Sequence, residues 1–149
     1  MEARGGREQT RFPWGDKVLD DNQRHRCNVF QGSFPSQNTK LDGWEWTAPA
    51  RSFPPQNDFD LFEMVGNVWE WTFDEFTSSH SPLHRVDQIQ PFDPFSDAPP
   101  TSDRVLKGGS FLCQRAVCFR FRSGARSSAS PDSSSSNVGF RCVSSPFGL

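Results

Sequence analysis

Turn-forming residues recur every few positions between residues 17 and 60, and this spacing leaves no room for a long helix or strand. The stretches DDNQ, QGSFPSQN, LDGW and FPPQND all fall in this tract. Gly, Pro, Asn, Asp and Ser favour turns because they tolerate or fix turn backbone angles, or bond to their own main chain. The whole chain of 149 residues contains 12 Pro and 11 Gly. We therefore predict a loop-rich fold with short strands and few helices.

Aromatic side chains supply most of the material for a core. Only 34% of the residues are apolar, but 15 are Phe and 5 are Trp, and each buried ring removes a large apolar area from water. Several of these aromatics lie in the turn-rich tract, which indicates that it is packed although irregular. Such a region needs a support besides its core. Bound cations would serve, and Asn28 and Asp42 offer side-chain oxygens for them.

Charge and composition exclude several classes of partner. The formal net charge is -2 and no long basic run occurs, so the sequence carries no footprint of nucleic-acid binding. No stretch approaches the roughly 18 apolar residues of a membrane span. The N-terminal stretch MEARGGREQTRFPWG is charged and polar, so we expect neither a signal peptide nor an anchor there. Four cysteines are too few for a disulfide scaffold of this length.

Two apolar segments predict the regular elements. Residues 61–76 are the densest apolar stretch, and we predict a short helix that ends at Gly66 and then a strand through Trp69 and Trp71. Residues 104–112, RVLKGGSFL, predict a second strand that is broken at the Gly-Gly pair.

The remaining segments predict one strand and two loops. Residues 116–122 alternate apolar and polar side chains, the pattern of a half-buried strand. Residues 77–102 contain five Pro and show no period, and we predict a surface excursion. The serine-rich residues 127–137 precede a new apolar pattern, which favours an internal loop over a tail.

The pair Cys113 and Cys118 poses the main question about function. Positions five apart lie about 140° apart around a helix axis and on opposite faces of a strand, so neither regular element brings the two sulfurs together. A turn within residues 114–116 would do so. Cys118 then shares a face with Arg120 and Arg122, whose positive charge favours a reactive thiolate.

The residues alone leave several interpretations of this pair open. Both cysteines can be small buried hydrophobes, as most free cysteines are. A zinc half-site needs two further ligands, for which Cys27, Cys142 and His25 are the candidates. A redox disulfide and a reactive thiol pair also fit the spacing.

Several motifs occur in the order known from one family. They are EARGG, FPWG, DGW, TAPARSFPPQN, DLFEMVGNVWEWTFD, RVLKGGSFLC, RFRSGAR and PDSSSSNVGFRC. Together they resemble the formylglycine-generating enzyme (sulfatase-modifying factor) family from about residue 2 to residue 143. The resemblance implies a loop-rich α+β fold of the C-type-lectin-like formylglycine-generating type. It also implies that residues 1–149 are the C-terminal half of that domain, truncated at the N-terminus.

The family resemblance implies an oxidoreductase that depends on Cu(I). Such an enzyme uses O2 to convert a cysteine in a C-x-P-x-R motif of unfolded sulfatase polypeptides to Cα-formylglycine. By resemblance Cys113 and Cys118 bind the copper and Ser110 is a catalytic neighbour, while Trp69 and Asn137 contact the substrate. Two thiolates are soft ligands that suit Cu(I). Each of these three residues also has a structural interpretation. Ser110 can be a turn residue, Trp69 a core residue and Asn137 a turn cap.

The resemblance further implies two structural calcium sites. The first uses the side chains of Asn28 and Asp42 with the carbonyls of Val29 and Trp44. The second uses Glu63, the carbonyls of Gly66 and Val68, and Glu70. Glu63 stands where the family has a neutral amide. A structural alternative is an Asp-Gly turn at Asp42 and surface acids at Glu63 and Glu70.

Some positions depart from the family pattern. Ala3 and Ser123 stand where vertebrate-type members have a disulfide, and Cys142 matches half of a second disulfide whose partner precedes residue 1. Cys27 matches no family cysteine.

The departures in length favour, as the alternative function, a non-catalytic paralogue or fragment that binds sulfatases or family members. A sulfoxide-synthase-like iron enzyme would need more histidines than the 3 present. By resemblance a eukaryotic member would reside in the endoplasmic reticulum lumen.

Overall fold

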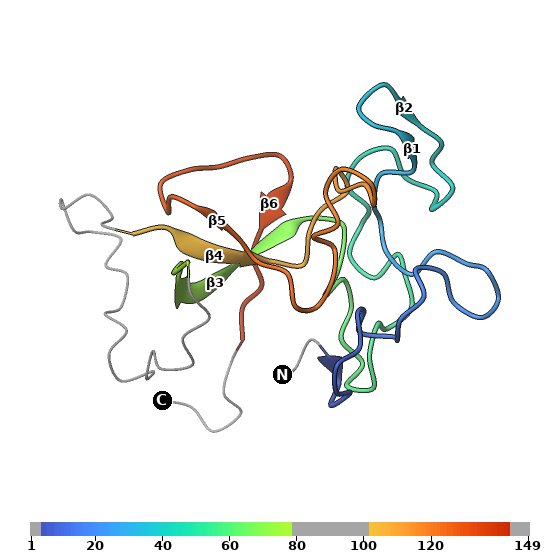
Figure 1. The fold of residues 1–149 in the computed structure, drawn as a ribbon, viewed down its shortest axis with the longest axis horizontal. Helices are drawn as coiled ribbons and strands as arrows, with labels where there is room; N and C mark the ends of the chain where they lie inside the picture. The colour runs from blue at the N-terminus through green and yellow to red at the C-terminus, as the bar shows by residue number, and fades with distance from the viewer. Residues whose placement is uncertain (1–3, 79–101, 144–149) are drawn as a thin grey trace.

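The computed structural model describes residues 4–78 and 102–143, and its regular elements are six short strands (Figure 1). They are β1 Gly32–Ser33, β2 Gln37–Asn38, β3 Trp69–Glu75, β4 Arg104–Lys107, β5 Ser127–Ala129 and β6 Val138–Gly139. In the described ranges no helix is long and apolar enough to cross a lipid bilayer. The prediction of a loop-rich fold with little regular secondary structure is confirmed.

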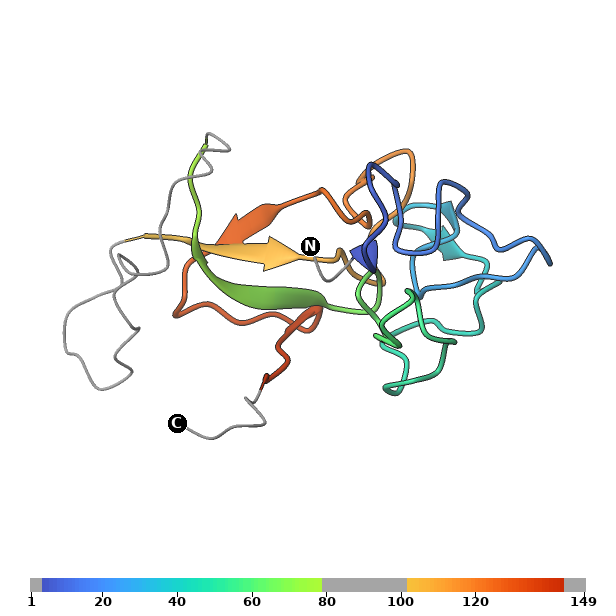
Figure 2. The same ribbon diagram turned by 90° about the horizontal axis from the view of Figure 1, so that it is seen from below.

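Four of the strands form one sheet in the order β5-β4-β3-β6. The β3–β4 and β4–β5 pairs are antiparallel, whereas β6 runs parallel to β3 and pairs Val138 with Trp69. The register of β3 against β4 slips between Trp71 and Glu75. The sheet lies to one side of the molecule, and the loops of residues 4–68 lie to the other (Figure 1, Figure 2).

We call residues 4–68 and 108–126 the irregular region. Side-chain amides hold part of its main chain, in addition to main-chain bonds between distant segments. Gln56 donates from Nε2 to the carbonyls of Arg26 (2.9 Å) and Val65 (3.0 Å), and its Oε1 accepts from the Val65 amide (2.9 Å). Asn67 bonds in the same way to both main-chain groups of Ala48. The turn-rich tract is therefore packed although it is irregular, as the aromatic content predicted.

The hydrophobic core lies where the sheet meets the irregular region. Phe12 and Phe121 are fully buried and stack with ring centroids 5.9 Å apart. Trp69 and Leu106 join them from β3 and β4, and Cys113 joins them from the segment after β4. Burial of each large side chain contributes roughly 1.5–3 kcal/mol before the cost of ordering it. The core therefore fixes the segment that carries the cysteines against the sheet.

The predicted helix that ends at Gly66 is wrong. Glu63, Gly66 and Asn67 have positive φ angles of 47°, 85° and 63°, which a right-handed helix cannot contain. The amide of Gly66 bonds instead to the Gly108 carbonyl at 2.9 Å, and that of Asn67 to the Asn28 carbonyl at 2.8 Å. Long-range hydrogen bonds have replaced the local helical ones. The strand through Trp69 and Trp71 is confirmed as β3.

The predicted strand over residues 116–122 is also wrong. The Arg120 amide bonds to the Cys118 carbonyl (2.8 Å) and the Arg122 amide to the Arg120 carbonyl (2.9 Å), so consecutive tight turns take the place of a strand. These turns still bury Phe121 and expose both arginines. The Gly-Gly break after β4 is confirmed, because β4 ends at Lys107. The excursion predicted for residues 77–102 lies almost wholly outside the described residues.

Candidate active site

A turn after Cys113 brings the two sulfur atoms together. The Cys118 amide bonds to the Gln114 carbonyl at 2.7 Å, and the Gln114 side chain accepts from the Ala116 amide at 2.8 Å. The two Sγ atoms lie 3.1 Å apart. A disulfide bond is only about 2.05 Å long, so the sulfurs are in contact and not bonded. The turn predicted from the spacing is confirmed.

The Cys113–Cys118 loop is anchored on both sides. The Cys113 carbonyl accepts from the Phe30 amide at 3.0 Å, and the Ser123 amide donates to the Arg11 carbonyl at 3.1 Å. Both bonds join the segment after β4 to the loops of residues 4–68, among which it lies in both views (Figure 1, Figure 2). The loop is therefore held in a defined position relative to the N-terminal part of the chain.

The two sulfurs differ in environment. Cys113 is 2% exposed, and burial, followed by the neighbouring sulfur, raises the pKa of its thiol to about 12. Cys118 is half-buried. Burial raises the pKa of Cys118 too, but hydrogen bonds from Cys113 and from Arg120 together outweigh burial, and the net shift is downward. Of the two thiols, Cys118 is therefore the more readily ionised, and its thiolate would accept the S–H of Cys113.

Arg120 contacts three parts of the site. Its Nε donates to Cys118 Sγ at 3.3 Å and its Nη1 donates to Ser127 Oγ at 3.1 Å. Its guanidinium carbon lies 5.8 Å from the centroid of the Trp69 ring. Arg122 instead lies over Phe119 at 5.8 Å. The sequence predicted both arginines beside Cys118, and the structure places only Arg120 against the sulfur.

Ser110, Asn137 and Trp69 are brought to the same site by a chain of hydrogen bonds. Ser110 is 0% exposed, and its Oγ accepts from Asn137 Nδ2 at 3.0 Å. The Asn137 carbonyl accepts from the Trp69 amide at 2.8 Å, next to the β3–β6 pairing. Ser135 Oγ donates to Asn137 Oδ1 at 2.6 Å. The sequence missed the parts that Ser127 and Ser135 play, because both lie in a stretch with the composition of a linker.

A pair of converging thiols suits a soft monovalent metal such as Cu(I). The described residues contain no cluster of three or more His, Cys, Asp or Glu side chains, so Cys27, Cys142 and His25 do not complete a zinc site with the pair there. Cys27 is buried in the core, and burial raises the pKa of its thiol. It behaves as a small hydrophobic residue, and Cys142 is exposed.

The residues of the first predicted calcium site only partly converge. Gln31 Nε2 donates to Asp42 Oδ2 at 2.6 Å and also to the Val29 carbonyl, so these two oxygens face one position. Asp42 Oδ1 accepts from the Trp44 amide at 3.0 Å. The Asn28 side-chain amide donates to a main-chain carbonyl at 2.7 Å. The oxygens of Val29 and Asp42 suit a hard cation at the place of the Gln31 nitrogen.

Three of the four residues of the second predicted calcium site line a shared pocket. Glu63, Val68 and Glu70 lie with Arg141 around a cavity of about 460 Å3. Glu63 Oε1 is buried without a hydrogen-bond partner among the described residues, which a bound cation would satisfy. Glu70 pairs with Arg141, whose Nε lies 2.7 Å from Glu70 Oε2. Gly66, the fourth residue, does not line this cavity.

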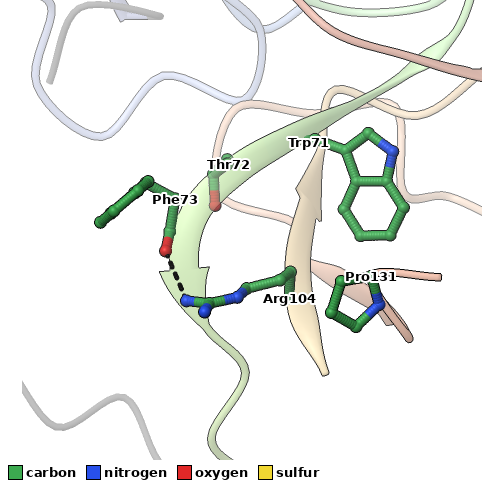
Figure 3. A pocket seen from close by; sticks show the side chains of 5 residues that line it. All are labelled: Trp71, Thr72, Phe73, Arg104 and Pro131. Atoms are coloured by element: carbon green, nitrogen blue, oxygen red, sulfur yellow. Dashed lines mark hydrogen bonds between the residues drawn. The ribbon is translucent and has the colours of Figure 1, made fainter. Parts of the chain in front are cut away.

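A separate pocket of about 350 Å3 lies along the sheet (Figure 3). Trp71 and Pro131 flank one side and Phe73 the other, with Arg104 between them donating to the Phe73 carbonyl at 3.0 Å. None of its lining residues belongs to the sulfur site.

The position of the expected missing disulfide is only partly described. Ser123 is buried, and its hydroxyl has no hydrogen-bond partner in the described part of the chain. Ala3 lies outside the described residues. The loss of this disulfide therefore stays a prediction.

Solved structures with the same fold support the predicted class. The crystal structure of CarF matches with a TM-score of 0.55 at 18% sequence identity, over 93% of this chain and 41% of that one. Treponema denticola variable protein 1 matches with a TM-score of 0.57 at 21% identity, over 93% of this chain and 42% of that one. These matches place the chain in the loop-rich class of folds to which both proteins belong.

Comparison of sequences then gives the family. The model of the sulfatase-modifying factor enzyme 1-like domain matches residues 1–146. The chain is 48% identical to the formylglycine-generating enzyme of Mus musculus over 95% of this chain and 36% of that protein. It is 43% identical to that of Thermomonospora curvata over 98% of this chain and 46% of that protein. The chain therefore belongs to the formylglycine-generating enzyme family.

The family also contains relatives named as inactive. The inactive C-alpha-formylglycine-generating enzyme 2 of Bos taurus is 35% identical over 95% of this chain and 40% of that protein. The chain spans less than half the length of each of these three relatives.

Proposed function

We propose that the chain carries the thiol part of the active site of a formylglycine-generating oxidase. In this proposal Cu(I) binds Cys113 and Cys118, and O2 oxidises a cysteine in a C-x-P-x-R motif of sulfatase polypeptides to Cα-formylglycine. The main support is the contact of the two sulfurs at 3.1 Å. Relatives named formylglycine-generating enzyme, at 42–48% identity, support the reaction, and the match to the sulfatase-modifying factor domain supports the substrate class.

The overall reaction sets what the site must manage. Converting the substrate's CH2–SH group to an aldehyde, with release of sulfide, removes two electrons. Reducing O2 to water takes four, so a thiol reductant supplies the other two. Bound Cu(I) would supply a soft site at which the substrate thiolate and O2 meet.

Around that site the chain's own groups orient the sulfurs and handle protons. Asn137 donates to the Ser110 oxygen, which leaves the Ser110 proton free to face the neighbouring Cys113. A hydrogen bond from Ser110 opposes the rise of the Cys113 pKa, as a donor to a thiolate would. Trp69 lies beside the sulfur site, against the guanidinium of Arg120. In this proposal Ser110 stabilises the Cys113 thiolate, and Asn137 and Trp69 position the substrate peptide.

Calcium has a structural part in the proposal. The oxygens of Val29 and Asp42, and the carboxylate of Glu63, would bind it and fix the irregular region. Removal of calcium with a chelator is expected to lower the melting temperature by several degrees, since a ligand of the folded state alone stabilises it by mass action. Melting curves with and without added calcium check this, and identical curves would contradict the calcium proposal.

The copper proposal is tested by a Cys118→Ser variant. The full chain is expected to bind one Cu(I) per molecule, and the variant to bind it at least about 100-fold more weakly because a hydroxyl is a poor ligand for a soft ion. The measurement is competition with a colour-forming Cu(I) chelator without oxygen. Cys142→Ser, which changes an exposed cysteine, is the matched control. Equal affinities of wild type and Cys118→Ser would sink the proposal.

The second candidate is a binding protein without turnover, which the relatives named as inactive favour. Incubation of the chain with a C-x-P-x-R peptide, copper, a thiol reductant and O2 separates the two candidates. Mass spectrometry of the peptide is expected to show the mass loss of formylglycine. Peptide binding without this loss would support the second candidate.

A further inference from the structure

We infer that Arg120 is the positioning residue and charge partner of the metal-loaded thiol pair. Arg120 neutralises the charge of that site and fixes the direction in which the Cys118 sulfur faces. The inference deepens the proposed function and rests on it for the identity of the metal. It goes beyond the sequence expectation because it assigns this part to one arginine and excludes its neighbour Arg122.

The first support is that the Arg120 guanidinium is fixed at three points. Nε donates to Cys118 Sγ (3.3 Å), Nη1 donates to Ser127 Oγ (3.1 Å), and the group lies over the Trp69 ring at 5.8 Å. These partners come from the cysteine loop, from β5 and from β3. A side chain that only covered a surface would not need partners from three segments. The arrangement holds the Nε–H bond pointing at the sulfur.

The second support is the charge of the loaded site. Two thiolates carry two negative charges and Cu(I) carries one positive charge, so the loaded pair has a net charge of minus one. Cys113 is almost wholly buried and Cys118 is half-buried, so water solvates this charge poorly and a partner of opposite sign is required. In the part of the chain that the structure describes, Arg120 is the cation that donates a hydrogen bond to either sulfur.

The third support is the chemistry of the group. A guanidinium is planar, keeps its charge at all working pH values, and presents several donors at fixed angles while it stacks on an aromatic ring. Those properties let one side chain bind a sulfur, a hydroxyl and a ring at once. A lysine keeps the charge but offers a single nitrogen. Substitution of Arg120 by Lys or by Met can therefore separate the contribution of its charge from that of its hydrogen-bond geometry.

The inference is tested by the Cu(I) affinities of the wild-type chain and four variants. They are measured on the full chain by chelator competition without oxygen. Arg120→Met keeps the length of the side chain and removes its charge, and it is expected to weaken binding at least tenfold. Arg120→Lys keeps the charge and is expected to lie between Arg120→Met and wild type. Arg122→Met is the matched control. It removes the same charge only two residues away, from a guanidinium that lies over Phe119 and not against a sulfur. It is expected to bind as wild type does.

Unchanged affinity in Arg120→Met overturns the inference, as does an equal loss in Arg122→Met, which would show a general charge effect. Ser127→Ala leaves the charge in place and frees one anchor of the guanidinium, and a loss of a few fold is expected. If Arg120→Met fails to fold by circular dichroism, Arg120→Lys and Ser127→Ala decide, and wild-type affinity in both overturns the inference. A wild-type chain that binds no Cu(I) instead refutes the proposed function, and the inference with it.

Discussion

The four-stranded sheet and the irregular region differ in how much their main chain depends on bonds to side chains. In the sheet, main-chain groups pair with main-chain groups along β3, β4 and β5. In the irregular region, main-chain bonds between distant segments are joined by bonds from the side-chain amides of Gln56, which is buried, and Asn67, which is half-buried. In the sheet each main-chain pair stands beside similar pairs, whereas in the irregular region one side chain, Gln56, bonds three main-chain groups at once.

The candidate active site draws on both regions. Trp69 lies on β3 and Asn137 directly precedes β6, so the pairing of these two strands sets their positions. Cys113 and Cys118 come from the irregular region, where tight turns bring sulfurs into contact that no strand or helix could. Ser110 joins the two through Asn137. The sheet thus provides a stable base, and the irregular region provides the reactive groups.

The largest effect is expected from Gly109→Ala in the irregular region. Gly109 has φ of 75°, and an added Cβ would lie 2.7 Å from the main chain of Phe121. The positive φ and the overlap with the main chain are together expected to destabilise the fold by about 4 kcal/mol. Urea denaturation measures the change. Gly43→Ala is the control, since its φ is also positive at 97° but nothing lies within 4 Å, and it is expected to cost only about 1 kcal/mol. Similar losses in both variants would show that close packing at Gly109 does not matter.

A smaller effect is expected from Gln56→Ala. Gln56 is 1% exposed, and its loss leaves two buried main-chain groups of Val65 and the half-buried carbonyl of Arg26 without this partner. We expect a loss of about 3 kcal/mol, because each unpaired buried group costs about 1–3 kcal/mol and water can reach some of them. Thr72→Val in the sheet removes a side-chain bond to the Val105 carbonyl and is expected to cost less than about 1 kcal/mol. If the sheet variant loses as much, the contrast between the two regions is wrong.

The sequence predicted those features that depend on neighbouring residues. The density of apolar residues predicted β3, and the Gly-Gly pair predicted the end of β4. The spacing of Cys113 and Cys118 predicted the turn between them. Each of these follows from backbone preferences or from the geometry of short segments. The class of fold came from the order of family motifs.

Features that depend on distant partners were not predicted. The helix expected before Gly66 is replaced by hydrogen bonds to residues more than thirty positions away. The strand expected over residues 116–122 has no neighbouring strand, so its alternation arises from tight turns. β5 was missed because its residues, Ser127–Ala129, have the composition of a linker and pair only because β4 lies beside them. Arg120 was named, but only the fold could separate it from Arg122.

The smallest effect concerns Lys107, where the sheet meets the irregular region. Its ammonium donates to the carbonyls of Ser123 (2.8 Å) and Ala125 (2.6 Å). Burial, followed by the charges of Arg126 and Arg4, lowers the pKa of Lys107 to about 8. An unfolded chain keeps an ordinary lysine pKa near 10.4. Between these two values the unfolded state binds more protons than the folded state, so stability contributed by this group rises with pH.

Comparison of wild type with Lys107→Met isolates this group, since shifts of other groups cancel in the difference. As the pH rises from about 8 to about 10, the free energy of unfolding of wild type is expected to increase by on the order of 1 kcal/mol relative to that of the variant. This value is reduced because the ammonium is only partly buried. Urea denaturation at each pH measures both proteins. Arg104→Met is the control, because it removes a charge on β4 that stays ionised throughout this range. The difference in unfolding free energy between wild type and Arg104→Met should not change with pH. A difference that stays constant with pH would mean that Lys107 keeps its proton in the folded state, so that the junction between the two regions behaves like exposed surface.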